Sequence, residues 1–216
     1  MNWLSTFFKK LILIIFPLRC MYCDNICTES ICEVCDKIIK EKFCAKIIKT
    51  HYREVICASA FAYQGCVKEA IKRFKFKHEK SYKDEFSKLV AKTVKKCFPK
   101  QKFDLITCVP IHENRVNTRG YNQSELIARG VSKILGISFE NTLIKTQNNR
   151  SQHGLNFAKR QTNVDGVYKL IKNLDGKKIL ICDDIITTGA TLNECITTLF
   201  RAKADVFCAC LAYTEK

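Results

Sequence analysis

The sequence predicts an α/β fold, a doubly wound parallel sheet with a small cysteine module on its N-terminal side. Three observations lead to this class. Short apolar segments alternate with segments of helical periodicity beyond about residue 100, as in parallel sheets. Two Cys-x-x-Cys pairs lie near the N-terminus. The 216 residues, 47% of them hydrophobic, are enough for one medium domain and a small appendage.

The first predicted element is an amphipathic helix over Asn2 to Ile15, whose apolar residues recur every three or four positions and which ends near Pro17. The apolar run from Leu11 to Leu18 is too short to span a bilayer, and no cleavage site of small residues follows it. We therefore expect a cytoplasmic protein whose first helix docks on its own core. Weak membrane association is the alternative.

The remaining elements follow from periodicity and from turn residues. A short strand and turn are expected around Phe61, Tyr63 and Gly65. Helices are predicted over Cys66 to His78, Ser81 to Lys96, Asn122 to Leu135 and Thr191 to Ala202. Strands are predicted over Phe103 to Val109, Lys178 to Cys182 and Val206 to Ala212. Residues 145–163 are polar and basic without periodicity, which predicts a long functional loop.

The chain is strongly basic, with 37 Lys and Arg against 21 Asp and Glu, a net charge of +16. The stretch from Cys66 to Lys102 holds 13 basic and four acidic residues, or +9. Such charge favours polyanionic partners, and Phe74, Phe76 and Tyr82 within it are candidates to stack on nucleic-acid bases. A solvated lysine-rich surface is the alternative interpretation.

Fourteen cysteines are present, and no signal peptide supports disulfide formation in a secreted protein. Two Cys-x-x-Cys turns close in sequence supply four thiolates for a tetrahedral Zn²⁺ site, formed by Cys20, Cys23, Cys32 and Cys35. Replacement of one ligand by Cys27 or Cys44, a redox pair, and scattered buried thiols are the alternatives. Cysteines within predicted strands are interpreted as small core residues: Cys108, Cys182, Cys208 and Cys210.

The most informative segment runs from Lys178 to Thr191. An apolar strand ends at Asp183 and Asp184, which places both carboxylates at the edge of the sheet where ligands bind. The hydroxyls of Thr187 and Thr188, the absent Cβ of Gly189 and the free N–H groups of a helix that opens at Ala190 and Thr191 suit a phosphate. Paired acids accept hydrogen bonds from ribose hydroxyls, so a sugar 5-phosphate satisfies both halves. The alternative is an acidic strand end with a threonine-rich helix cap.

A second motif follows the strand that ends at Val109. Arg115 and Arg119 are four residues apart, and Gly120 and the amides Asn122 and Gln123 come next. We interpret this segment as a second anion-facing turn, because arginine offers a fork of donors to phosphate oxygens. A surface arginine pair is the alternative.

Taken in order, these segments resemble the ComF family, which pairs a cysteine zinc module with a phosphoribosyltransferase-like domain. The segment at Asp183 also resembles the signature with which type I phosphoribosyltransferases bind phosphoribosyl pyrophosphate (PRPP). The matching positions are Cys20/Cys23, Cys32/Cys35, Tyr63-Gln64-Gly65, Lys75-Phe76, Val109 to His112, Arg115 to Gln123, Gln152 to Val164 and Asp183 to Thr191. The resemblance divides the chain into a helix at 1–18, a zinc-binding module and linker at 19–50, and a phosphoribosyltransferase-like domain at 51–216.

The resemblance also implies roles for the two motifs. Asp183 and Asp184, the candidate catalytic residues, hold ribose hydroxyls, and residues 187–191 hold the 5-phosphate. Arg115 and Arg119 face the pyrophosphate. Mg²⁺ enters with PRPP, bound largely by the oxygens of the ligand and by water. The family is associated with natural transformation (competence) and with handling single-stranded DNA on the cytoplasmic side.

Three functions remain open from the sequence. The first is a PRPP-binding module that handles single-stranded DNA. The second is an active phosphoribosyltransferase of nucleotide salvage or biosynthesis, although no segment defines a base pocket, and neither His112 nor His153 is a clear acid or base. The third is a scaffold for a competence helicase or channel protein that uses the helix Asn2 to Ile15.

Overall fold

The structure is a computed structural model that describes residues 17–49, 55–76, 79–146 and 167–214. The predicted helix from Asn2 to Ile15 therefore lies outside the described residues, as do His153 and most of the predicted loop at 145–163. In the described part of the chain, no helix combines the length and the apolar character needed to cross a bilayer.

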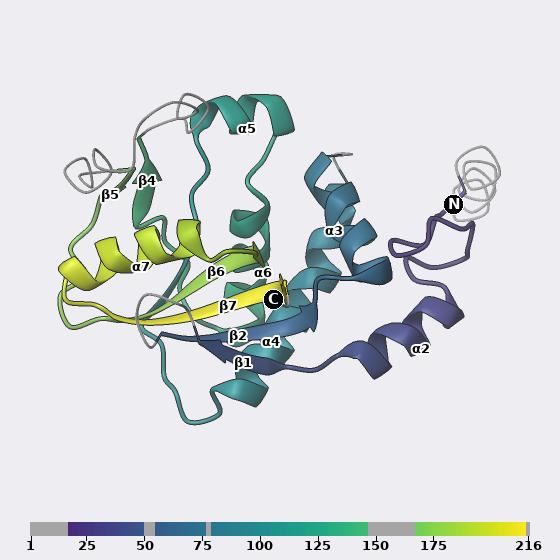
Figure 1. The fold of residues 1–216 in the computed structure, drawn as a ribbon, viewed down its shortest axis with the longest axis horizontal. Helices are drawn as coiled ribbons and strands as arrows, with labels where there is room; N and C mark the ends of the chain where they lie inside the picture. Colours follow the sequence, from purple (N-terminus) through teal and green to yellow (C-terminus); the bar gives the residue numbers. More distant parts are fainter. Residues whose placement is uncertain (1–16, 50–54, 77–78, 147–166, 215–216) are drawn as a thin grey trace, which may run out of the picture.

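A five-stranded sheet forms the centre of the molecule, in the order β1-β2-β7-β6-β3 (Figure 1). The bounds are Lys46–Lys49 for β1, Ile56–Ala62 for β2, Asp205–Tyr213 for β7, Lys178–Ile186 for β6 and Leu105–Cys108 for β3. Strands β2, β7, β6 and β3 run parallel, and β1 is an antiparallel edge strand. The predicted parallel sheet is confirmed.

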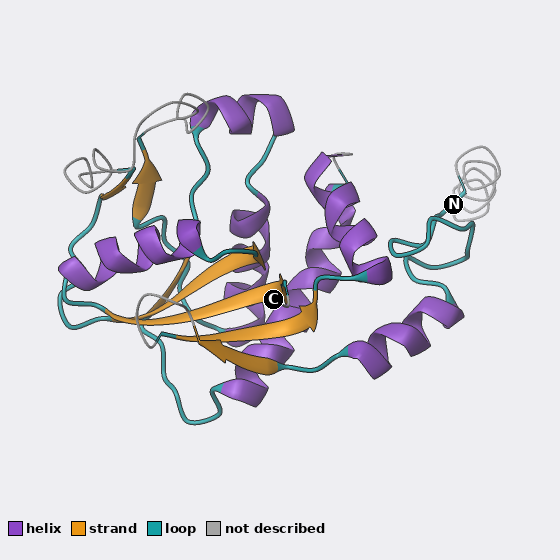
Figure 2. Ribbon diagram, viewed as in Figure 1, coloured by secondary structure: helices purple, strands orange, loops and turns teal. Residues whose placement is uncertain are grey.

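Alternating side chains of the strands enter two separate cores, one on each face. Leu180 and Cys182 pack into a core with the helices α3 (Gly65–Phe76), α4 (Lys83–Cys97) and α6 (Gln123–Leu135). Ile179 and Ile181 pack on the opposite face with α7 (Ala190–Arg201). A separate two-stranded sheet, β4 (Leu143–Lys145) and β5 (Tyr168–Leu170), stands apart from the main sheet (Figure 2). Helices on both faces confirm the doubly wound class.

The topology creates a crevice between β3 and β6. These strands are parallel neighbours, with Cys108 opposite Cys182. The chain leaves β3 through α5 (Glu113–Arg119) toward α6 on one face, whereas it leaves β6 directly into α7 on the other. Connections that diverge to opposite faces leave a gap at the carboxyl ends of the two strands, where ligands bind in open α/β sheets.

Two predictions about local structure near this crevice were wrong. The strand expected to end at Cys182 continues to Ile186, because residues 183–186 still pair with β7 although β3 has ended. The segment at Arg115, predicted to be a turn, is the helix α5, capped by His112 at its start and by Gly120 at its end. The pattern of apolar residues did not predict the strands β1, β4 and β5 or the helix α2 (Glu33–Lys42).

Candidate functional site

A cleft of about 280 Å³ opens at the carboxyl ends of β3 and β6. Two segments and one side chain line it: Val109 to His112 after β3, Asp183 to Leu192 from the last residues of β6 into the first turn of α7, and Lys75 at the end of α3. Five further side chains complete the lining: Arg115, Gln123, Ser124, Lys145 and Tyr168. Residues far apart in sequence thus meet at the topological switch point of the sheet.

The two acids lie inside this cleft and are buried, 9% exposed for Asp183 and 6% for Asp184. Oδ1 of Asp183 accepts hydrogen bonds from the Ser124 hydroxyl at 2.7 Å and from the backbone N–H of Asp184 at 2.8 Å. Burial, followed by the neighbouring charge of Asp184, raises the pKa of Asp183 to about 7. Within the described part of the chain, the side-chain contacts of both acids use Oδ1, which leaves Oδ2 of each carboxylate to accept hydrogen bonds from a ligand.

Among the described residues, Lys75 is the cation that forms an ion pair with the acid pair. Its Nζ atom lies 2.9 Å from Oδ1 of Asp184, and both side chains are largely buried. Sequence reasoning did not select Lys75 as a site residue, although it belongs to the quoted Lys75-Phe76 match. Its position against Asp184 comes from the packing of α3 beside α6, which no local pattern reveals.

The segment after the acids forms an exposed turn into α7. Thr187 and Thr188 are exposed, and Gly189 adopts a left-handed conformation with φ of 77° that favours glycine. The Thr188 hydroxyl accepts a hydrogen bond from the N–H of Ala190, the first residue of α7. Hydroxyls and free N–H groups at the start of a helix provide the donors that a phosphate requires.

The arginines of the second motif are placed differently. Arg115 lines the cleft, while Arg119 ends α5 and its side chain lies outside the described part. His112 also lines the cleft, and its Nδ1 accepts a hydrogen bond from the N–H of Asn114 at 3.2 Å. His112 therefore serves as the N-terminal cap of α5.

Lys145 and Tyr168 approach the cleft from the sheet formed by β4 and β5. The Lys145 ammonium lies 5.3 Å from the centre of the Tyr168 ring. Burial, together with the charge of Arg115, lowers the pKa of Lys145. Burial raises the pKa of Tyr168. Sequence reasoning missed both residues, because the short strands that carry them lack a distinctive pattern.

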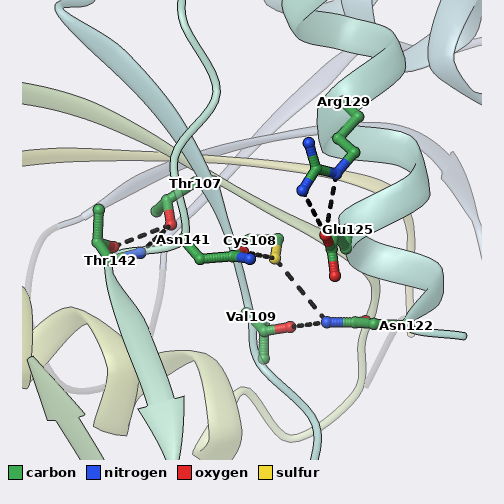
Figure 3. A network of polar contacts seen from close by, with 8 residues as sticks. All are labelled: Thr107, Cys108, Val109, Asn122, Glu125, Arg129, Asn141 and Thr142. Carbon is green, nitrogen blue, oxygen red and sulfur yellow. Dashed lines mark hydrogen bonds and ion pairs between the residues drawn. The ribbon is translucent and has the colours of Figure 1, made fainter. Parts of the chain in front are cut away.

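A polar network fixes the wall of the cleft beside β3 (Figure 3). The Asn122 side chain donates to the carbonyl of Val109 at 3.0 Å and accepts from the N–H of Ser124, capping α6. The Thr107 and Thr142 hydroxyls form a buried hydrogen bond of 2.9 Å. Figure 3 also shows the ion pair Arg129–Glu125 at 2.8 Å, which lies within α6. The network holds the end of β3 to the start of α6, which carries Ser124.

A second candidate site lies in the cysteine module. The sulfur atoms of the four predicted cysteines all lie within 4.8 Å of one another: Cys20, Cys23, Cys32 and Cys35. The sulfurs of Cys23 and Cys32 are 3.8 Å apart. Four thiolates around Zn²⁺ with bonds of about 2.3 Å place neighbouring sulfurs about 3.8 Å apart, so the donor set fits a tetrahedral metal.

Local structure presents these thiols on two elements. Cys20 and Cys23 lie on a tight turn in which Asp24 has φ of 69°, and Cys32 and Cys35 lie at the start of α2. Although burial acts in the opposite direction, backbone hydrogen bonds led by that of Cys32 lower the pKa of Cys20 to about 6.

The two alternative zinc ligands, Cys27 and Cys44, lie outside the four-cysteine group. The Cys27 thiol donates to the carbonyl of Glu29, and that of Cys44 donates to the carbonyl of Ala60. Neither belongs to the four-cysteine group, and the thiols of Cys182, Cys208 and Cys210 lie in the core.

The cysteine module is attached to the helix that carries Lys75. Nη2 of Arg73 donates to the carbonyls of Met21 and Tyr22 at 2.7 and 2.6 Å. Figure 1 shows the module beside α3, far from β4 and β5. The module is therefore held to the helix that lines the cleft, two residues from Lys75.

The lysines of the basic stretch are exposed along α3 and α4, but two of its three candidate stacking residues are buried. Phe74 is fully buried and Tyr82 is 8% exposed, and both pack edge-on against Phe86. The expectation that they stack on bases was wrong, since they belong to the core. Phe76 is 64% exposed.

Comparison with known families gives a match over the C-terminal part of the chain. The phosphoribosyl transferase domain family matches residues 121–216. This match contains α6, β6, the turn at Gly189 and β7. It begins after α3 and the cysteine module, so it does not describe Lys75 or the four cysteines.

Three curated proteins are similar to the chain. The DNA utilization protein YhgH of Escherichia coli K12 is 32% identical over 111 residues, 50% of this chain and 49% of YhgH. Competence protein F of Haemophilus influenzae is 26% identical over 86% of this chain and 92% of that protein. Competence protein ComFC of Bacillus subtilis is 29% identical over 62% of this chain and 54% of ComFC. The match to YhgH thus spans about half the length of that relative.

Proposed function

We propose that this chain, which belongs to the ComF family of phosphoribosyltransferase-like proteins, binds PRPP in the cleft between β3 and β6. The observation that carries the proposal is the convergence of Asp183, Asp184 and the hydroxyl-rich turn before α7 on one cleft. Acceptors and phosphate-binding donors then face the same space, as a ribose 5-phosphate requires.

In this proposal the free carboxylate oxygens of Asp183 and Asp184 accept the ribose hydroxyls, and the turn from Thr187 to Thr191 donates to the 5-phosphate. Arg115, which lines the same cleft, faces the pyrophosphate. Arg119 is assigned the same role by resemblance. Mg²⁺ enters with PRPP and is bound mainly by ligand oxygens and water.

Calorimetric titration of PRPP with Mg²⁺ tests the binding site. The wild-type chain should bind one equivalent, and the double variant Asp183→Asn, Asp184→Asn should bind at least tenfold more weakly. Asparagine retains the shape of each side chain, so a loss of affinity reports on the lost charge and the lost acceptor oxygen. Equal binding by both proteins would exclude the acids from the site.

We further propose that the protein handles single-stranded DNA on the cytoplasmic side during natural transformation. Two observations support this role. The names of the relatives refer to competence and DNA utilization. Nine lysines of α3, α4 and the following turn are exposed: Lys68, Lys72, Lys83, Lys88, Lys92, Lys95, Lys96, Lys100 and Lys102.

Salt dependence tests the DNA proposal. Binding through lysine–phosphate contacts releases counterions, so affinity for an oligo-deoxythymidine should fall steeply as salt rises. Replacing Lys88, Lys92 and Lys95 by Gln should weaken binding and reduce the salt slope by up to about three. An affinity for DNA that does not change with salt concentration would contradict the proposal. Pyrophosphate release with a nucleobase would instead favour the transferase alternative.

We also assign a structural Zn²⁺ to the four-cysteine group. Four thiol ligands without an open position are typical of structural rather than catalytic zinc. The bound Zn²⁺ would stabilise the turn whose carbonyls, those of Met21 and Tyr22, bind Arg73 of α3. The metal site would thereby help to hold α3 in place.

A further inference from the structure

Lys75 is carried by the last turn of α3, which ends at Phe76. The last carbonyl groups of a helix have no partner within the helix and are satisfied by side chains, water or caps. Two such carbonyls, those of Phe74 and Lys75, are bound here by side chains from another segment. The end of α3 is therefore held from outside.

The segment that binds these carbonyls is the Tyr121-Asn122-Gln123 motif. The Tyr121 hydroxyl donates to the carbonyl of Phe74 at 2.5 Å, and Nε2 of Gln123 donates to the carbonyl of Lys75 at 3.4 Å. Tyr121 is 6% exposed and Gln123 is 2% exposed, so both contacts are shielded from water. The ring of Tyr121 also lies 5.8 Å from that of Phe74.

The middle residue of the motif holds the other wall of the cleft. Asn122 donates to the carbonyl of Val109, directly after β3. Three consecutive side chains therefore bind backbone carbonyls on two sides of the cleft. The sequence predicted that the amides of this motif face an anion, whereas their donors bind protein carbonyls.

We propose that Lys75 is a ligand-binding residue that contacts the anionic groups of PRPP, and that Tyr121 and Gln123 are positioning residues that hold it opposite Asp184. The inference rests on the proposed function. It adds Lys75 as a cation of the binding site, and Tyr121 and Gln123 as the residues that hold it in place. We refer to Tyr121 and Gln123 together as the clamp. Neither Lys75 nor the clamp forms a covalent bond with the ligand.

Charge explains why the cleft needs Lys75. Asp183 and Asp184 are buried side by side, and without a cation they would oppose the approach of an anionic ligand. The ammonium of Lys75 has three donors, of which the contact with Asp184 at 2.9 Å uses one. The remaining donors are available to phosphate oxygens in the same cleft. A shift of the helix end by about 1 Å would break the contact of 2.9 Å between Lys75 and Asp184, because hydrogen bonds weaken steeply as they lengthen.

A double-mutant cycle tests the proposal, with PRPP affinity and Tm measured for each protein. Lys75→Met should lower the affinity at least tenfold, and Tyr121→Phe, which removes only the hydroxyl, should lower it three- to tenfold. The double variant should bind no more weakly than Lys75→Met alone, because the clamp acts through the ammonium. Gln123→Met removes the second and longer contact with α3, at 3.4 Å, and should lower the affinity less than Tyr121→Phe does.

Matched controls separate positioning from stability. Lys72→Met removes an exposed lysine of the same helix that pairs with Glu69, and it should leave PRPP affinity unchanged. Tyr22→Phe removes a buried hydroxyl that has no hydrogen-bond partner among the described residues, and it should also leave affinity unchanged. Lys75→Arg should restore part of the affinity lost in Lys75→Met.

Two outcomes would overturn the inference while leaving the proposed function intact. Wild-type affinity in Lys75→Met would show that the ammonium does not touch the ligand. A Tyr121→Phe effect of equal size in the wild-type and Lys75→Met backgrounds would show that the clamp acts independently of Lys75. No PRPP binding by the wild-type chain would overturn the proposed function together with the inference.

Discussion

The Ser124 hydroxyl donates to Oδ1 of Asp183 across 2.7 Å, joining the first turn of α6 to β6. Burial, and then the charge of Asp184, raises the pKa of Asp183 to about 7, while the hydrogen bond from Ser124 and the charge of Lys75 act in the opposite direction. The cleft therefore holds a carboxyl group that changes charge near neutral pH.

The raised pKa of Asp183 predicts that the charge of this residue destabilises the ligand-free protein. An exposed carboxyl, as in the unfolded chain, has a pKa near 4. Between about pH 4 and pH 7 the folded protein binds the extra proton, so the contribution of this group to the free energy of unfolding falls as pH rises. Asp183→Asn, which retains the acceptor Oδ1, should raise the free energy of unfolding by about 1–3 kcal/mol at pH 7.5.

Urea unfolding of Asp183→Asn and the wild type at pH 5 and pH 7.5 measures this effect. The stabilisation should be smaller at pH 5, where Asp183 is largely protonated in the folded protein. A variant that is less stable than the wild type at pH 7.5 would contradict the prediction.

The same group predicts a pH dependence of PRPP binding. Asp183 must be ionised for both of its oxygens to accept hydrogen bonds, one from the Ser124 hydroxyl and the other from a ribose hydroxyl. The affinity for PRPP should therefore rise between about pH 6 and pH 8. Ser124→Ala removes a hydrogen bond that lowers the pKa of Asp183, and the midpoint should therefore move to higher pH. Calorimetry across this range, corrected for ligand ionisation, measures the midpoint. An unchanged midpoint in Ser124→Ala would show that Asp183 does not control binding.

The sequence predicted the parts of the site that lie on one continuous segment. The apolar strand, the acid pair and the Thr-Thr-Gly turn form a local pattern between Lys178 and Thr191, and all of these lie together at the cleft. The end of the strand was wrong by four residues, because pairing with β7 continues after β3 has ended. That difference depends on a neighbouring strand that local hydrophobicity does not describe.

Residues contributed by other elements could not be predicted in this way. Lys75 and Ser124 reach the acids only because α3 and α6 pack on the same face of the sheet. The motif at Tyr121 was recognised, but its contacts with α3 were not predicted, since its partners there are backbone carbonyls that carry no sequence signal. Phe74 and Tyr82 have aromatic side chains suited to stacking on bases, yet the fold uses them in the core.

Close packing of α4 against α6 predicts a strict requirement for glycine at position 130. A Cβ atom there would lie 2.1 Å from Oγ and 2.5 Å from Cβ of Ser87. Gly130→Ala should lower the free energy of unfolding by about 1–3 kcal/mol, despite the better helix propensity of alanine. Ser87→Gly removes both obstructing atoms, so adding Gly130→Ala to that variant should cost less. Urea unfolding measures the free energy of unfolding of the wild type, both single variants and the double variant. An equal loss on adding Gly130→Ala to the wild type and to Ser87→Gly would refute the contact.

The four-cysteine group predicts one bound zinc per chain. Purified protein should contain one equivalent by elemental analysis, and Cys32→Ser should lose it, because a hydroxyl is a poor replacement for a thiolate. Cys27→Ser is the matched control and should keep the metal, since the Cys27 thiol hydrogen bonds to the carbonyl of Glu29. Loss of zinc should also lower Tm, because Arg73 of α3 holds the backbone of Met21 and Tyr22 within the metal-binding turn. Zinc retained in Cys32→Ser, or lost in Cys27→Ser, would require a different set of ligands.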